Sequence, residues 1–131
     1  MMINKAGKFD ESIPSINKIV FSIGGYFLGY ETRTFTFDEK VHVEVAKSIL
    51  ATEKKYTVTH DLSKEDFFKE LQELHIGEWD SDYTNHNVLD GTQWELEIDF
   101  SDGNRPVKIY GSNEYPYNFK ALTELLGVED F

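Results

Sequence analysis

The feature that most constrains the fold is an alternating segment in the last third of the chain. Its apolar positions are Trp94, Leu96, Ile98 and Phe100. The polar positions that alternate with them are Gln93, Glu95, Glu97 and Asp99. Alternation with a period of two is typical of a β-strand that buries one face and leaves the other in water. A turn at 101–104 and a second apolar segment at 107–110 follow directly, which predicts a hairpin. The apolar side of such a hairpin must be covered by other elements.

Further strands are predicted in the first half of the chain, at residues 18–23, 31–37, 41–46 and 56–60. The segment 31–37 alternates threonine with Arg33 and phenylalanine, as a half-buried strand does. Gly24 and Gly25 are expected to interrupt the first strand.

Two helices are predicted, over residues 63–76 and 116–126. Ser63 is a candidate N-cap, and apolar residues follow it at helical spacing up to Leu74, with Gly77 as the expected stop. Pro116 suits the first turn of the second helix, and Gly127 suits its end. Because strands and helices do not alternate in βαβ order, we predict an α+β fold. It is a curved, mainly antiparallel sheet of about five to six strands with both helices on one face.

Size and composition indicate a single domain. The chain has 131 residues and no cysteine, which fits a cytoplasmic protein, and residues 1–17 lack the apolar core of a signal peptide. We predict a loosely ordered N-terminal arm at 1–17 and one α+β domain at 18–131.

Two stretches of the chain resemble a family block. They are the segment from Trp94 to Gly103 and the corner from Tyr110 to Phe119, which reads Tyr-Gly-Ser-Asn-Glu-Tyr-Pro-Tyr-Asn-Phe. This block resembles small bacterial or phage domains of unknown function, in which a hairpin with an aromatic corner leads into a terminal helix. The resemblance implies a fold and a bacterial or phage origin, but no activity. Within the corner, Asn113 or Ser112 is expected to cap the backbone ahead of the helix, and Tyr115 and Phe119 to pack on the core.

The charge of the chain is concentrated in its second part. No lysine or arginine lies between Lys69 and Arg105, although that interval holds ten carboxylates. Residues 51–131 contain eighteen acidic residues against seven basic ones, and the formal net charge of the chain is −11. The negative electrostatic field of such a charge distribution attracts basic partners and repels nucleic acids and anionic membranes.

The sequence contains no motif that predicts catalysis. The glycines at 24–29 do not have the spacing of a phosphate-binding loop. The segment that begins at Asp80 lacks the glycine and the final glutamate of an EF-hand loop. The four histidines do not have the spacing of a zinc site. We therefore expect a protein that is not an enzyme, with no catalytic residue, metal or cofactor.

We interpret the chain as an acidic binding domain that docks on a basic protein and inhibits it. Immunity proteins that neutralise toxin nucleases, and phage inhibitors that mimic nucleic acid, are proteins of this kind. The expected contact residues are Asp80, Asp82, Tyr83, Glu95, Glu97 and Asp99. Trp79 and Tyr110 are further aromatic side chains that could be exposed. We expect no direct contact with nucleic acid or membrane, and a monomer or a weak dimer.

Three alternatives remain at this level. The acidic strand could serve only solubility and protection of the sheet. The loop from Glu78 to Asp90 could support a small metal-dependent hydrolase. Tyr26, Phe27, Leu28 and Tyr30 could form an apolar patch through which copies of the chain associate.

Overall fold

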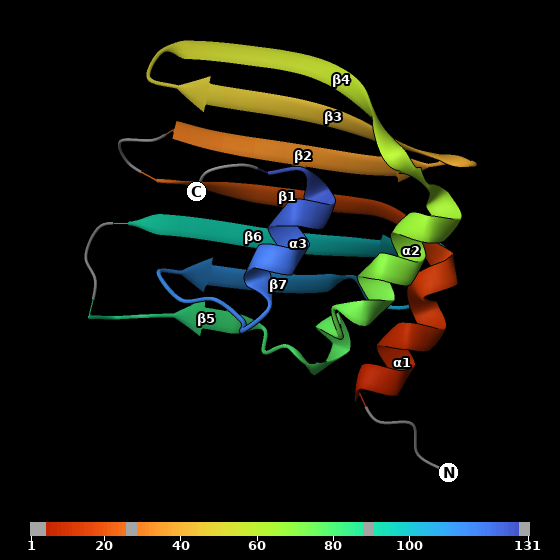
Figure 1. Ribbon diagram of the computed structural model, residues 1–131. Helices are drawn as coiled ribbons and strands as arrows, with labels where there is room; N and C mark the ends of the chain where they lie inside the picture. The colour runs from red at the N-terminus through yellow and green to blue at the C-terminus, as the bar shows by residue number, and fades with distance from the viewer. Residues whose placement is uncertain (1–4, 26–28, 88–90, 129–131) are drawn as a thin grey trace.

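A computed structural model describes residues 5–25, 29–87 and 91–128 and contains one seven-stranded sheet (Figure 1). The order of its strands is β4-β3-β2-β1-β6-β7-β5. The strands are β1 (Ile16–Gly25), β2 (Gly29–Phe37), β3 (Lys40–Ile49), β4 (Thr52–Ser63), β5 (Asp82–Thr84), β6 (Thr92–Phe100) and β7 (Val107–Ser112). The helices are α1 (Lys5–Ser12), α2 (Lys64–Glu73) and α3 (Phe119–Leu126), with short 3₁₀ turns η1 (Ile13–Ser15) and η2 (Ile76–Glu78). The predicted α+β class is confirmed.

The chain builds the sheet from its centre outward. Strands β1 to β4 form an antiparallel meander, and β6 pairs with the free side of β1. Helix α2 carries the chain from β4 at one edge across the sheet toward β5 at the other edge (Figure 1). All the strand pairs are antiparallel except that of β5 with β7, which is parallel.

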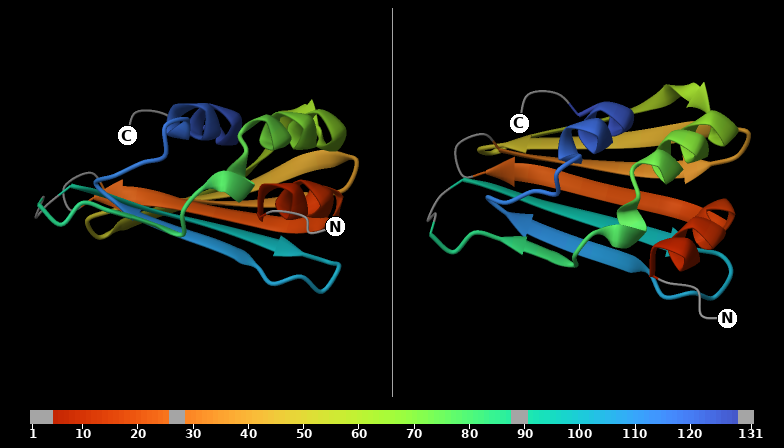
Figure 2. Two further views of the ribbon diagram at one scale, coloured as in Figure 1. Left: turned by 90° about the horizontal axis from the view of Figure 1, so that it is seen from below. Right: turned by 60° about the horizontal axis from the view of Figure 1, so that its bottom comes forward.

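The three helices lie on the same face of the sheet, as the edge-on view in Figure 2 shows. Every second residue of the central strands points toward them and is buried, for example Phe21, Phe35 and Trp94. The core is strongly aromatic: the Phe119 ring of α3 lies 4.7 Å from the Trp94 ring and 6.0 Å from the Phe21 ring. The opposite face carries no helix in the described part of the chain.

The two predicted helices begin and end close to the expected residues. The Ser63 hydroxyl accepts a hydrogen bond from the Asp66 amide at 3.2 Å, which confirms the N-cap of α2. Gly127 ends α3 in the left-handed conformation with φ 78°, as predicted. The stop after α2 differs from the prediction, because His75 takes the left-handed conformation (φ 52°) and Gly77 lies inside η2.

The prediction of five to six strands and two helices falls short of the seven strands and three helices that the structure describes. The missed helix, α1, falls in the segment for which an N-terminal arm was predicted. It is held by packing, because Phe9 is buried with its ring 6.3 Å from that of Phe100, and Ile13 of η1 is buried as well. The missed strand, β5, has only three residues. No helix of the described residues has both the length and the apolar character that crossing a bilayer requires.

The corner from Tyr110 to Phe119 fixes the start of β6 rather than the start of α3. Asn113 has φ 58°, and its side-chain oxygen accepts a hydrogen bond from the Thr92 amide at 2.9 Å. At the N-cap of α3, Asn118 makes no side-chain cap hydrogen bond. The expected helix cap at Asn113 or Ser112 is therefore replaced by a cap on the neighbouring strand. Phe119 packs in the core as predicted, whereas Tyr115 is 37 % exposed and reaches the core through the Phe119 ring, with ring centroids 4.9 Å apart.

Candidate protein-binding surface

The face of the sheet that carries no helix is the candidate site, and we call it the open face. Residues that are paired across neighbouring strands point to the same side of a sheet. The strand register therefore places on the open face the residues that alternate with the core positions. The charged residues on this face are Lys18, Lys40, Glu44, Glu53, Lys55, Asp82, Glu95, Glu97, Asp99 and Lys108. Six carboxylates thus share this face with four lysines.

The predicted acidic strand lies beside the centre of this face. In β6, Trp94, Leu96 and Ile98 are buried, so Glu95 and Glu97 between them point to the open face. Asp99 follows them along the same side of β6, opposite Lys18 of β1. The spacing of side chains along one face of a strand is ~6.7 Å, from a rise of ~3.3 Å per residue.

The same face brings in an aspartate from the far edge of the sheet. Asp82 of β5 pairs with Tyr110 of β7, and Tyr110 pairs with Glu95 of β6. The three residues form one row across three neighbouring strands, and strands lie ~4.8 Å apart. The two carboxylates therefore flank an aromatic ring that is 39 % exposed. We call the three residues Asp82, Tyr110 and Glu95 the acidic row.

Two of the three predicted β6 carboxylates have a lysine beside them. Lys18 Nζ lies 3.5 Å from Asp99, and Lys108 Nζ lies 3.8 Å from Glu97. These lysines come from the two strands that flank β6. The sequence interval around β6 contains no basic residue, but the fold places these two lysines beside it. Both pairs are solvent-accessible and contribute little stability. In the described part of the chain, Glu95 and Asp82 have no lysine, arginine or histidine within 4.0 Å.

A second exposed tyrosine lies on the open face. Tyr30 of β2 is half exposed, and its ring lies across Gly24 of β1, where a Cβ atom would approach the Tyr30 ring to 2.5 Å. Its hydroxyl donates to the Gln93 side-chain oxygen of β6 at 3.5 Å. The side chain thus extends from β2 over β1 to β6.

Small neutral side chains occupy the middle of the open face. Thr32, Thr34 and Thr36 of β2 point to this side, and the Ser22 and Thr32 hydroxyls lie 3.0 Å apart. Short side chains leave this region of the sheet level.

Two predicted contact residues lie elsewhere. Tyr83 pairs with Gly111 and packs on the helix side, with its ring 5.9 Å from that of Trp94. Its hydroxyl accepts a hydrogen bond from the Asp80 amide at 2.9 Å, and burial raises the pKa of Tyr83. Asp80 is exposed and borders a pocket on the same helix side. Trp79, considered as an exposed aromatic, is only 2 % exposed and belongs to the core.

The structure describes only some of the residues considered for a metal-dependent hydrolase and for self-association. Among residues 5–25, 29–87 and 91–128, no group of three His, Asp or Glu side chains is gathered as metal ligands. Asp90, at the end of the acidic loop considered for a hydrolase, lies outside these residues. Tyr26, Phe27 and Leu28, considered for self-association, also lie outside them.

No protein-family model matches the chain, and no curated protein matches it.

Proposed function

We propose that this protein is a non-enzymatic binding domain that docks its open face on a basic partner protein and inhibits it. The observation that carries the proposal is the acidic row. Asp82 and Glu95 have no cation beside them in the described residues, and Tyr110 lies between them. Carboxylates beside an exposed aromatic ring form a good receptor for an arginine, which pairs with the acid and stacks on the ring.

The charge of the whole chain supports the same partner class. A net charge of −11 steers a cationic protein toward the molecule and speeds its association. An enzyme that acts on nucleic acid keeps a cationic substrate site. Occupation of that site by the open face would exclude the substrate, as immunity proteins and phage inhibitors do.

The local geometry favours recognition of a basic patch over extended mimicry of nucleic acid. A phosphate backbone presents one charge per ~3.4 Å of axis along each strand of a duplex. On β6 only Glu95 lacks a neighbouring lysine, because Glu97 and Asp99 lie beside Lys108 and Lys18. On β5 and β6, the open-face carboxylates without a neighbouring cation instead lie across the strands, from Glu95 to Asp82. We therefore propose a compact arginine-bearing patch as the binding counterpart.

Two charge-reversal variants test the proposal. The first, Asp82→Lys/Glu95→Lys, reverses the acidic row. The matched control, Glu70→Lys/Glu73→Lys, makes the same change in net charge on α2, on the helix side of the sheet, where both residues are exposed. Wild type and both variants are immobilised and used to capture proteins from the source cell at low ionic strength, and the activity of the captured protein is then assayed with and without each variant.

The proposal expects a basic protein that the wild type and the α2 variant capture and inhibit, and that the open-face variant does not. Association should slow steeply as salt is added, because the attraction is screened. A partner that is lost with the α2 variant and retained by the open-face variant would contradict the proposal.

A further inference from the structure

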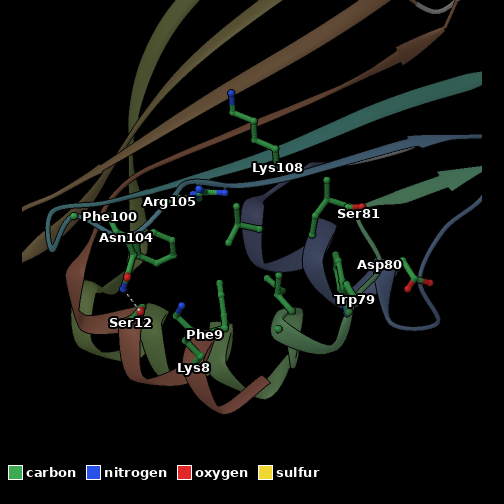
Figure 3. A pocket seen from close by; sticks show the side chains of 15 residues that line it. Lys8, Phe9, Ser12, Trp79, Asp80, Ser81, Phe100, Asn104, Arg105 and Lys108 are labelled. Carbon is green, nitrogen blue, oxygen red and sulfur yellow. Dashed lines mark hydrogen bonds between the residues drawn. The ribbon is translucent and has the colours of Figure 1, made fainter. Parts of the chain in front are cut away.

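A pocket of about 480 Å³ lies on the helix side of the sheet, away from the open face (Figure 3). It is formed where α1 and η2 meet the end of the β6–β7 hairpin. Its apolar lining is provided by Phe9, Ile76, Trp79, Phe100, Val107 and Ile109. A volume of this size is in the range of pockets that hold small organic ligands.

The pocket walls are held by the core. Phe9, Ile76 and Trp79 are each less than 10 % exposed, and Trp79 packs edge-on to Trp94 at 6.5 Å. Phe100 and Val107 are half-buried, so part of their apolar surface faces the pocket. A ligand would therefore meet a preformed aromatic surface, which lowers the entropy cost of binding.

Two cationic side chains border this apolar lining. Lys8 comes from α1, and Figure 3 shows its side chain rising toward the pocket. Arg105 comes from the loop between β6 and β7. In the described part of the chain, neither has a carboxylate within 4.0 Å. Unpaired cations at a pocket are unexpected on a chain with a net charge of −11.

The loop that carries Arg105 is fixed by hydrogen bonds. The Asn104 side-chain amide donates to the Ser12 hydroxyl of α1 at 2.9 Å and to the Asp102 carboxylate at 3.0 Å. The Asn104 backbone amide also donates to Asp102 at 2.9 Å. These bonds tie the loop to α1, which places Lys8 and Arg105 on two adjoining walls of one pocket.

The other two charged residues around the pocket do not cancel this positive end. Lys108 extends away from the pocket in Figure 3 and reaches Glu97 on the open face at 3.8 Å. The Asp80 side chain points away from the pocket at its other end. The pocket is thus apolar along its length and cationic at the end formed by α1 and the β6–β7 loop.

We infer that this pocket binds a small amphipathic carboxylic acid, with its apolar body against Phe100, Trp79 and Val107 and its carboxylate between Lys8 and Arg105. Charge complementarity selects the anion, because a carboxylate can accept charge-assisted hydrogen bonds from both side chains. The aromatic lining selects a planar or short aliphatic body. The inference is independent of the proposed function, since the pocket and the acidic row lie on opposite sides of the sheet.

The test is a titration with 3-phenylpropionate and with its uncharged amide, followed by calorimetry and by the indole N–H resonance of Trp79. Lys8→Gln and Arg105→Gln remove one cation each. Lys120→Gln, at an exposed lysine of α3, is the matched control. Val107→Trp fills the pocket without removing a charge.

We expect the acid to bind at least tenfold more tightly than its amide and to shift the Trp79 resonance. Each cation variant should weaken binding of the acid about tenfold, which is the loss of one charge-assisted hydrogen bond, and leave binding of the amide unchanged. Lys120→Gln should bind the acid as the wild type does, and Val107→Trp should bind neither compound. Equal binding of acid and amide, or no binding at millimolar acid, would overturn the inference. Much tighter binding of a phenylalanine-ended peptide with a free carboxylate would also overturn it, because the pocket would then be a site for a protein C-terminus.

Discussion

Glu95 faces Tyr110 across the β6–β7 pair, on the side of the sheet that no helix of the described chain covers. The pair joins the two kinds of contact that an arginine uses, a carboxylate and an aromatic face. Neither residue belongs to the core, whose members on these strands are Trp94, Leu96, Ile98 and Ile109. Binding and stability should therefore respond separately to substitutions on this face.

Reversal of Glu95 should leave the fold intact. We expect Glu95→Lys to change the free energy of unfolding by no more than ~0.5 kcal/mol, as exposed substitutions do. Glu97→Lys and Asp99→Lys should each cost somewhat more, up to ~1 kcal/mol, because each places a like charge beside Lys108 or Lys18. Urea unfolding of the three single variants measures these differences. Loss of cooperative unfolding in Glu95→Lys would mean that the acidic strand has a structural role.

Gly111 should be intolerant of alanine, because the Trp94 indole occupies the space beside it. A Cβ atom at Gly111 would lie 2.0 Å from Trp94 Nε1, which itself donates a hydrogen bond to the Glu114 carbonyl at 3.0 Å. We expect Gly111→Ala to lower the free energy of unfolding by ~3 kcal/mol. Gly103→Ala is the control: its φ of 86° is unfavourable for alanine, unlike that of Gly111, but nothing lies within 4 Å of the added Cβ atom, so we expect a loss of ~1 kcal/mol. Equal losses in urea unfolding would contradict this view of the corner.

The sequence predicted those elements whose side chains carry their own periodic signal. The alternation of β6 and the Ser63 cap with its apolar stripe were sufficient to place β6 and α2 within a few residues. Strand β5 could not be found in this way, because three residues are too short for a pattern. Its position depends on tertiary hydrogen bonds, in which the Tyr110 amide donates to the Ser81 carbonyl at 3.0 Å and the Asn85 amide to the Ser112 carbonyl at 2.9 Å.

The hydrogen bonds of His60 predict a proton on Nε2 and an acceptor at Nδ1. The Leu62 amide donates to His60 Nδ1 at 3.0 Å, so Nδ1 is the acceptor, and Nε2 donates to the Leu125 carbonyl at the end of α3 at 2.7 Å. Nitrogen-15 NMR of the imidazole should show this tautomer near neutral pH. The opposite tautomer would contradict the hydrogen-bond assignment.

Removal of the His60 side chain should loosen the contact between β4 and α3. We expect His60→Ala to lower the free energy of unfolding by ~2 kcal/mol, since the Leu62 amide and the Leu125 carbonyl lose their partner. His42→Ala is the matched control, because the exposed His42 hydrogen-bonds to Asp38 in a solvent-accessible turn and its loss should cost ~0.5 kcal/mol or less. Equal costs in thermal unfolding would assign His60 no bridging role.

Asp38 should contribute a small acid-dependent part of the stability. The Lys40 amide donates to its carboxylate at 2.7 Å and His42 bonds to it at 2.8 Å, and these bonds hold the pKa of Asp38 below its ordinary value of 3.8. Because the folded-state pKa is the lower one, the contribution is present above pH 3.8 and is lost as the pH falls through the folded value. The stability difference between wild type and Asp38→Asn should therefore shrink on acidification. An NMR titration midpoint for Asp38 at or above 3.8 would contradict this.

The candidate surface was only partly predictable, because its composition depends on tertiary contacts, as the position of β5 does. The sequence shows that Glu95, Glu97 and Asp99 share a face, because that follows from the period of one strand. Which residues lie beside them depends on the order of the strands, which local patterns do not contain. Strand order brings Lys18 and Lys108 next to β6 and Asp82 into line with Glu95, and it places Tyr83 on the other side of the sheet.

The most direct test of the central claim is an NMR titration of the ¹⁵N-labelled chain with an arginine-rich peptide, octa-arginine, at low ionic strength. The helix side offers a real competitor, because Glu70, Glu73 and Glu124 line a groove between α2 and α3. If the open face is the docking surface, the largest amide shifts will fall on β5, β6 and β7 around Asp82, Glu95 and Tyr110, and Asp82→Lys/Glu95→Lys will abolish them. Larger shifts on α2 and α3, unchanged in that variant, would contradict the account.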